Sequence, residues 1–157
     1  MELQLGQILA LIAASLAVIV TGIGSSRGVG MAGETAAGVA TENPEVAGKL
    51  LVLQLLPATQ GIYGFLIAVI VLINTGVLGG QMVSVTIDQG IKYIVGCLPV
   101  MIVGWYSAIK QARVSQAGML MTGKHPDMSG RGVTMAVMVE TYAVFGLLIS
   151  FLIVNSI

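Results

Sequence analysis

The sequence places one carboxylate, Glu140, inside an otherwise uncharged apolar stretch, residues 132–157. If the helix that carries it begins near Ser129 and crosses a membrane, Glu140 lies about 16 Å along the helix axis, close to the bilayer midplane. A charge at that depth costs about 2.5 to 3.5 kcal/mol on insertion scales, so such a residue is a functional candidate by default. Either the carboxyl group carries a proton or a bound cation neutralises it.

A second group of residues with helical spacing lies in the middle of another apolar stretch. Leu56, Thr59, Gln60 and Tyr63 are spaced i, i+3, i+4 and i+7, so they share one face of a helix. Pro57 lies within this group. Its ring lacks an N–H and crowds the carbonyl four residues earlier, so backbone acceptors nearby become available to a ligand.

Gln111 adds a further amide on a third apolar segment. Together with the Glu140 carboxylate, the Thr59 hydroxyl and the Gln60 amide, it could form a cage of oxygen atoms, with a backbone carbonyl of the Thr59 helix in reach. Hard cations take oxygen ligands, and one carboxylate among neutral oxygens balances a monovalent ion, which favours Na⁺ over Ca²⁺ or Mg²⁺. A proton would need fewer partners. Tyr63 is expected to donate its hydroxyl proton to the carboxylate, because a buried phenol needs a partner.

The composition fits a chain that is surrounded by lipid. It has 157 residues, of which 56% are hydrophobic and 9% are charged, with a mean hydropathy of +0.96, whereas soluble domains carry roughly 25% charge. This excludes a water-soluble enzyme. The formal net charge is zero, so no basic surface is available for nucleic acid. Cys97, the single cysteine, is expected to be a small core residue.

Long stretches without charged residues predict four transmembrane helices. One stretch of about 24 residues ends at Arg27 and another of about 38 begins at Leu50, whereas a span needs about 20. The second helix is expected to cover residues 44–77, followed by a turn at 76–80 and the start of the third helix near Val83. The predicted fold is therefore an all-α membrane protein with four transmembrane helices.

Two short polar segments that contain proline, residues 41–45 and 122–127, are predicted to be tight hairpin loops. All the basic residues except Lys92 lie in these loops or toward them: Arg27, Lys49, Lys110, Arg113, Lys124 and Arg131. The positive-inside rule then makes both loops cytoplasmic, so that both termini face the outer side.

The second half of the chain repeats the first at an offset of about 82 residues. Matched positions include a loop proline, a loop acid and a loop base, and they continue along the apolar helices: Gly22 with Gly104, Pro44 with Pro126, Glu45 with Asp127, Lys49 with Arg131, and Thr59 with Thr141. The chain is thus predicted to be a duplicated helical hairpin, residues 1–80 and 81–157. Ala58 occupies the position that Glu140 takes in the second half, so only the second hairpin has a membrane carboxylate.

Four segments resemble the proteolipid (c-ring, rotor) subunits of V-type ATPases, and most closely their sodium-translocating bacterial branch. The segments are GIGSSRGVGMAGE at 22–34, LQLLPATQGIYG at 53–64, IKQAR at 109–113 and MVETY at 138–142. The resemblance implies that Glu140 is the essential carboxylate and that Tyr63 is its hydrogen-bond partner. It further implies three side-chain ligands and one carbonyl ligand: Thr59, Gln60 and Gln111, and Leu56.

The same resemblance implies a mechanism and a set of partners. Identical subunits would form a ring in the bilayer that turns against a stator membrane subunit, which supplies an arginine. Central stalk subunits would connect this ring to an ATP-hydrolysing head. The chain would then be a non-catalytic subunit of an ATP-driven pump, carrying one Na⁺ per subunit in a bacterial plasma membrane.

Three other functions stay open at this point. The nearest is the same rotor carrying H⁺ instead of Na⁺. A tetraspan pore subunit is a second, and it would conduct ions without a partner. A four-helix membrane enzyme that handles glutathione is a third, but its site needs clustered arginines, and the chain has only Arg27, Arg113 and Arg131.

Overall fold

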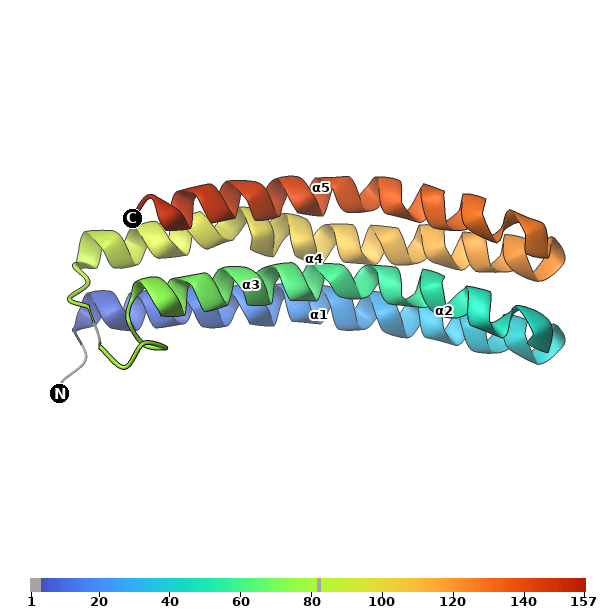
Figure 1. Cartoon of the computed structure of the whole chain (residues 1–157), viewed down its shortest axis with the longest axis horizontal. Coiled ribbons are helices and arrows are strands. Elements are labelled where there is room, and N and C mark those ends of the chain that lie inside the picture. The colour runs from blue at the N-terminus through green and yellow to red at the C-terminus, as the bar shows by residue number, and fades with distance from the viewer. Residues whose placement is uncertain (1–3, 82) are drawn as a thin grey trace.

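The computed structural model describes residues 4–81 and 83–157, which form two long helical hairpins side by side (Figure 1). The first hairpin consists of α1 (Leu5–Glu42), the 3₁₀ turn η1 (Pro44–Val46), α2 (Ala47–Leu55), the 3₁₀ turn η2 (Leu56–Ala58) and α3 (Thr59–Asn74). The second consists of α4 (Ile87–Lys124), the 3₁₀ turn η3 (Pro126–Met128) and α5 (Ser129–Asn155). Four helical segments are long and apolar enough to cross a membrane: Leu5–Glu42, Pro44–Asn74, Ile87–Lys124 and Pro126–Asn155. The prediction of four spanning helices is confirmed.

The two hairpins have the same construction at an offset of 82 residues. Helices α1 and α4 each contain 38 residues, and both begin with a capping box, at Gln4 and at Thr86. Both end at a residue with nearly the same backbone angles, Asn43 at φ −137° and His125 at φ −136°, and a 3₁₀ turn that starts with proline follows each. The duplication predicted from the sequence is therefore present in the backbone.

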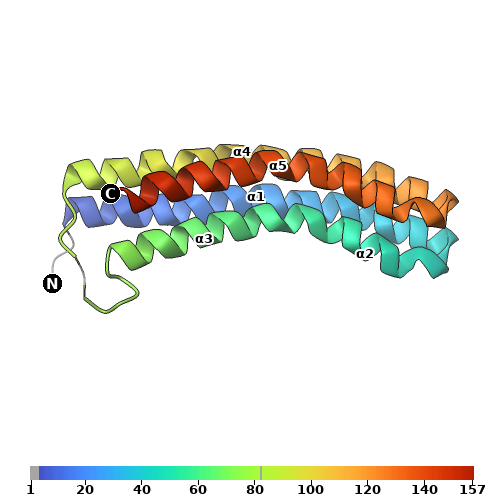
Figure 2. The same ribbon diagram turned by 45° about the horizontal axis from the view of Figure 1, so that its top comes forward.

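Helices α1 and α4 run parallel to each other and form the largest contact between the hairpins (Figures 1 and 2). Small residues allow their backbones to approach closely. A Cβ atom on Gly24 would lie 2.6 Å from the Cα of Trp105, and one on Gly28 would lie 2.9 Å from the carbonyl oxygen of Ala108. The first residues of α1 and the C-terminus lie at one end of the bundle, and the two polar loops lie at the other (Figure 1).

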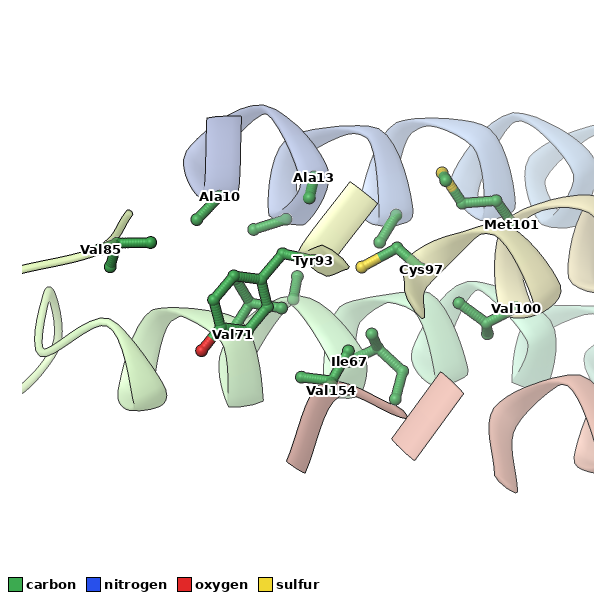
Figure 3. Close-up of a cluster of buried hydrophobic side chains, with 13 residues drawn as sticks. Ala10, Ala13, Ile67, Val71, Val85, Tyr93, Cys97, Val100, Met101 and Val154 are labelled. Carbon is green, nitrogen blue, oxygen red and sulfur yellow. The ribbon is translucent and has the colours of Figure 1, made fainter. Parts of the chain in front are cut away.

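The buried apolar residues form two clusters, one toward each end of the bundle. The cluster nearer the termini combines the small side chains of α1 with larger ones from α3 and α4, and it includes Ala13, Val71 and Tyr93 (Figure 3). Cys97 is fully buried in this cluster, as expected of a core residue. The second cluster lies toward the polar loops and includes Leu53 and Met119. Between them lies the polar site.

Two helix boundaries differ from those predicted. The second spanning helix ends at Asn74 rather than at residue 77, and α4 begins at Ile87 rather than near Val83. The physical reason is that Gly76, with φ +73°, lies in a run of turns at residues 75–80, and that residues 83–86 lie outside any helix. The N–H of Val83 donates to the Thr75 carbonyl at 3.1 Å, and the Gln7 side-chain amide donates to the Val83 carbonyl at 3.0 Å.

Candidate ion-binding site

The break in the second spanning helix places the polar face found in the sequence. Pro57 converts one turn into η2, and α3 starts immediately after it at Thr59. The carbonyl oxygen of Leu56 accepts the backbone N–H of Thr59, and it also accepts the Thr59 hydroxyl at 2.9 Å. A hydroxyl oxygen and a carbonyl oxygen are therefore held next to each other, on the side of the helix that also carries Gln60.

Gln60 and Gln111 join the two hairpins at the same depth. Both side chains are fully buried, and the Gln60 Nε2 donates to the Gln111 Oε1 at 2.7 Å. The Gln111 Nε2 in turn donates to the carbonyl oxygen of Ala136 at 3.1 Å and to Glu140 Oε2 at 3.4 Å. Three helices, α3, α4 and α5, thus contribute to one polar network inside an apolar bundle.

Glu140 is half-buried on α5, where its carboxylate faces this network. The Tyr63 hydroxyl donates to Glu140 Oε1 at 2.6 Å, a short bond of the kind found when the acceptor is charged. Gln60, Tyr63, Gln111 and Glu140 are therefore brought together as the sequence predicts. Within the described part of the chain, Thr59 makes no hydrogen bond to Glu140, because its hydroxyl donates to the Leu56 carbonyl instead.

One polar atom in the network has no partner. The Gln60 Oε1 is buried and accepts no hydrogen bond from the described residues. Buried polar atoms are nearly always satisfied, because leaving one unpaired costs about 1 to 3 kcal/mol. An unpartnered acceptor in a network that contains a carboxylate provides what a cation needs, which is an oxygen without a competing proton.

The polar groups at this junction include a single carboxylate. In the described residues no three His, Cys, Asp or Glu side chains come together as a multi-acid or thiolate metal site would require. The site has one carboxylate, two amides, a hydroxyl and a carbonyl. Such a set balances one positive charge and matches a hard monovalent cation.

Ser25 is a supporting residue that the sequence reasoning missed. Its hydroxyl donates to the carbonyl oxygen of Pro57 at 2.8 Å, and both groups are buried. The Cβ of Ser25 also lies 3.1 Å from where a Cβ on Gly61 would be, so α1 presses against the start of α3. The signal available in the sequence was a serine in the glycine-rich part of α1, but only the fold shows that it faces Pro57.

Comparison with known proteins identifies the family. The family model for the C subunit of ATP synthase matches the chain twice, over residues 12–71 and residues 94–153. The chain belongs to this family. The two matched segments are offset by 82 residues, the offset that relates α1 to α4, so each helical hairpin is one copy of the family's unit. The resemblance to rotor proteolipids that the sequence motifs indicated is confirmed.

Two relatives of this family match almost the whole chain. The V-type sodium ATPase subunit K of Enterococcus hirae is 45% identical over 149 residues, which are 95% of this chain and 92% of the relative. The A-type ATP synthase subunit K of Methanocaldococcus jannaschii is 36% identical over 145 residues, which are 92% of this chain and 61% of the relative. Members of this family are non-catalytic membrane proteolipids of ATPases, in agreement with the sequence-based prediction.

Proposed function

We propose that this chain is a subunit of the membrane rotor ring of a V-type ATPase and that it carries one Na⁺ at Glu140. The observation that carries the proposal is the junction of the two hairpins. There the carboxylate of Glu140 accepts from the buried Gln111 amide, and Gln60 in turn donates to Gln111. One buried amide oxygen, Gln60 Oε1, has no donor among the described residues. The similarity to a subunit whose name specifies a sodium ATPase supports Na⁺ as the cargo.

The proposed ligands are the carboxylate of Glu140, the side-chain oxygens of Thr59, Gln60 and Gln111, and the carbonyl oxygen of Leu56. Tyr63 orients the carboxylate without binding the ion. The Gln111 Nε2 now donates to Glu140 Oε2. Because a cation and an N–H₂ group compete for the same carboxylate oxygen, binding of Na⁺ is expected to turn the Gln111 amide so that its oxygen faces the ion.

Ion binding and rotation are coupled through the charge of Glu140. A bound Na⁺ neutralises the carboxylate, which allows the occupied site to face lipid. Beside the stator, an arginine from the stator protein would compete for the carboxylate, and the ion would leave. Moving one charge against 100 mV costs about 2.3 kcal/mol, which the ATP-hydrolysing head provides through the central stalk.

The placement in the membrane follows from the distribution of basic residues. Lys124 ends α4, Lys49 and Arg131 lie in the first turns of α2 and α5 next to the polar loops, and Lys92 lies near the start of α4. We therefore propose that the loops face the cytoplasm and contact the stalk, and that both termini face the outer side of a bacterial plasma membrane. The hairpins 1–80 and 81–157 act as one unit that carries one ion.

Protection from carbodiimide tests the proposed ion. A hydrophobic carbodiimide modifies a protonated carboxyl group in the membrane, and a bound cation protects that group. In purified protein at neutral pH, Na⁺ should slow the labelling of Glu140 and K⁺ should not, with Glu140→Gln as the measure of labelling elsewhere. Labelling that ignores Na⁺ but falls as the pH rises would support the proton-carrying alternative and contradict the sodium proposal.

A conductance measurement tests the rotor against the pore alternative. Purified protein in sealed vesicles should not carry a sodium current without the stator, because an occupied site is closed off by Tyr63 and the buried amides. A steady current through the isolated protein would contradict the rotor proposal and indicate a tetraspan pore.

A further inference from the structure

The internal repeat indicates how a second copy of this chain packs against the first. The two hairpins match in sequence at an offset of 82 residues, and α1 and α4 have equivalent bounds. Within one chain, α4 of the second hairpin packs on α1 of the first. In a ring of such hairpins, α1 of the next copy would pack on α4 in the equivalent way. Each contact inside the chain therefore has a counterpart between chains.

The free edge of the second hairpin has a groove that α1 of a second copy would fill. An apolar groove of about 410 Å³ lies between α4 and α5 and is lined by residues that include Val103, Tyr106 and Lys110. Their counterparts in the first hairpin are Thr21, Gly24 and Gly28. Those counterparts are buried against α4, since Gly24 contacts Trp105 and Gly28 contacts Ala108. The equivalent groove in the first hairpin is therefore occupied by a helix.

The free edge of the first hairpin carries the matching surface. Trp105 and Ala108, which contact Gly24 and Gly28 inside the chain, have Ile23 and Ser26 as counterparts, and both counterparts are exposed. A Cβ atom on Gly22 would have open space around it, whereas a Cβ atom on its counterpart Gly104 would lie 3.0 Å from the Thr21 side chain. This edge of α1 therefore suits the α4–α5 groove of a second copy.

The contact that joins the hairpins nearer the polar loops is polar. The Gln116 Nε2 donates to the Met31 carbonyl at 3.0 Å and to the Thr35 hydroxyl at 2.9 Å. The counterpart of Gln116 in the first hairpin is Glu34, and the counterparts of Met31 and Thr35 in the second hairpin are Arg113 and Ala117. Met31 contributes only its backbone carbonyl to the contact, so Arg113 is the charged residue at the corresponding turn of α4. Both charged residues are exposed on the free edges, and no ion pair to either occurs among the described residues.

We infer that Glu34 of one copy forms an ion pair with Arg113 of the neighbouring copy, and that this pair fixes the register between adjacent subunits. The inference rests on the ring assembly in the proposed function. Glu34 corresponds to position 116 of the second hairpin, which is three residues after Arg113. Since α1 and α4 are parallel, the repeat therefore places Glu34 of one copy and Arg113 of the next about 4.5 Å apart along the helix axis. Arginine and glutamate side chains span such a step easily, and a planar guanidinium can bind a carboxylate through two hydrogen bonds.

The ion pair would also prevent two unpaired charges from being buried when neighbouring copies pack together. When the groove and the facing edge come together, both charges leave the solvent, and an unpaired charge in such a contact is strongly unfavourable. Lys110, one turn earlier, already lies over the Tyr106 ring at 5.0 Å from its centroid. The counterpart of Lys110 is Gly28, which contacts Ala108, and the counterpart of Ala108 is Ser26. Lys110 should therefore face Ser26 of the next copy rather than Glu34. Lys110 is thus a matched control on the same helix.

Charge reversal tests the pair. Rings of the full chain would be purified in detergent, their mass measured by native mass spectrometry, and the temperature at which they dissociate into single subunits recorded. Glu34→Arg and Arg113→Glu should each lower this temperature. The double variant Glu34→Arg/Arg113→Glu restores an attractive pair at every junction, so it should recover at least half of the loss. Glu34→Arg/Lys110→Glu should not recover it.

The outcomes separate this inference from the proposed function. A wild-type chain that forms no ring would contradict the rotor proposal itself. Stable wild-type rings with no recovery in the Arg113 double variant, or with equal recovery in the Lys110 double variant, would overturn only the ion pair.

Cross-linking gives a second readout that does not depend on stability. A short bifunctional thiol reagent applied to Glu34→Cys/Arg113→Cys membranes, in a Cys97→Ala background, should produce dimers and higher species on denaturing gels. Each single-cysteine variant should stay monomeric, because each copy then offers a thiol at only one side of the junction. Double-cysteine protein that also stays monomeric would contradict the inferred contact.

Discussion

The Tyr63 hydroxyl lies 2.6 Å from Glu140 Oε1, and the two residues come from different hairpins of the chain. This hydrogen bond therefore does more than give the Tyr63 hydroxyl a partner. It fixes the orientation of the carboxylate at the junction where Gln60 and Gln111 also meet, and it connects α3 to α5 within an apolar bundle. Because the acceptor is a carboxylate, the bond belongs to the stronger class of protein hydrogen bonds.

Replacing Tyr63 with phenylalanine should weaken ion binding without removing it. The ring stays in place, but the carboxylate loses a donor whose hydrogen bond to a charged group contributes about 1.5 to 3 kcal/mol. We expect sodium affinity to fall at least tenfold, measured as the Na⁺ concentration that half-protects Glu140 from carbodiimide. Tyr106→Phe is the control, since Tyr106 is exposed and makes no hydrogen bond to Glu140 in the described residues. Equal losses in both variants would contradict the role of Tyr63.

Replacing Glu140 with glutamine should abolish transport while the chains still assemble. Glutamine keeps the shape and the hydrogen-bonding capacity, but it cannot neutralise a cation. In the complete ATPase, ATP-driven ²²Na⁺ uptake into vesicles should be lost and the variant chain should be recovered in rings of normal mass. Asp88→Asn, which removes the carboxylate of an exposed surface pair with Lys92, should leave uptake intact. Residual uptake by the Glu140 variant would show that another group carries the ion.

Two glutamines on α4 separate ion binding from packing. Gln111→Leu removes the amide that bridges Gln60 and Glu140, so sodium affinity should fall about tenfold or more, as expected for a lost ligand to a charge. Gln116→Leu removes a bridge to α1 only, so it should lower thermal stability and leave the affinity near its normal value. Both are measured by carbodiimide protection and by thermal dissociation in detergent. The opposite pattern would place the ion elsewhere.

The polar loops provide a test of coupling rather than of binding. Reversing the charge of Glu45 or Asp127, which follow the loop prolines, should uncouple ATP hydrolysis from Na⁺ uptake, because these loops are proposed to contact the stalk. Carbodiimide protection of Glu140 should stay normal, since the loops lie at the far end of the helices. Unchanged coupling in both variants would contradict the proposed contact.

The sequence predicted which polar side chains meet at the junction of the hairpins, but it did not predict the contacts that support them. Glu140 and Gln60 were recognisable because a carboxylate and an amide are rare in apolar helices, and helical spacing is enough to put Tyr63 on the same face as Gln60. The duplication was recognisable because loop residues such as Pro44 and Pro126 match. These signals are local or periodic, so a sequence carries them directly.

What the sequence did not provide depends on contacts between helices. The hydrogen bond from Ser25 to the Pro57 carbonyl joins α1 to η2, and no spacing rule relates two segments across a bundle. The start of α4 at Ile87 was missed for a similar reason. Val83, which precedes the helix, is hydrogen-bonded to Gln7 and Thr75 in other parts of the fold, and Thr86 then caps the helix.

Two glycines of α1 should respond in opposite directions to the same substitution. A Cβ on Gly28 would lie 2.8 Å from the Pro57 side chain and 2.9 Å from the Ala108 carbonyl oxygen, so alanine there must push α4 or η2 away. Overpacking of this kind typically destabilises by about 1 to 3 kcal/mol. Gly38 is exposed and has no such neighbour, so alanine there should stabilise the helix by roughly 0.5 to 1 kcal/mol.

The Gly28 variant should also weaken Na⁺ binding, because η2 positions the Leu56 carbonyl beside Thr59 and any shift of Pro57 moves that oxygen. Thermal dissociation and carbodiimide protection would be measured on Gly28→Ala and Gly38→Ala side by side. A Gly28 variant that loses stability but keeps full affinity would show that the Leu56 carbonyl is not a ligand, whereas a combined loss supports the ligand set. A Gly28 variant as stable as the Gly38 variant would contradict the close contact between α1 and α4 on which the whole site depends.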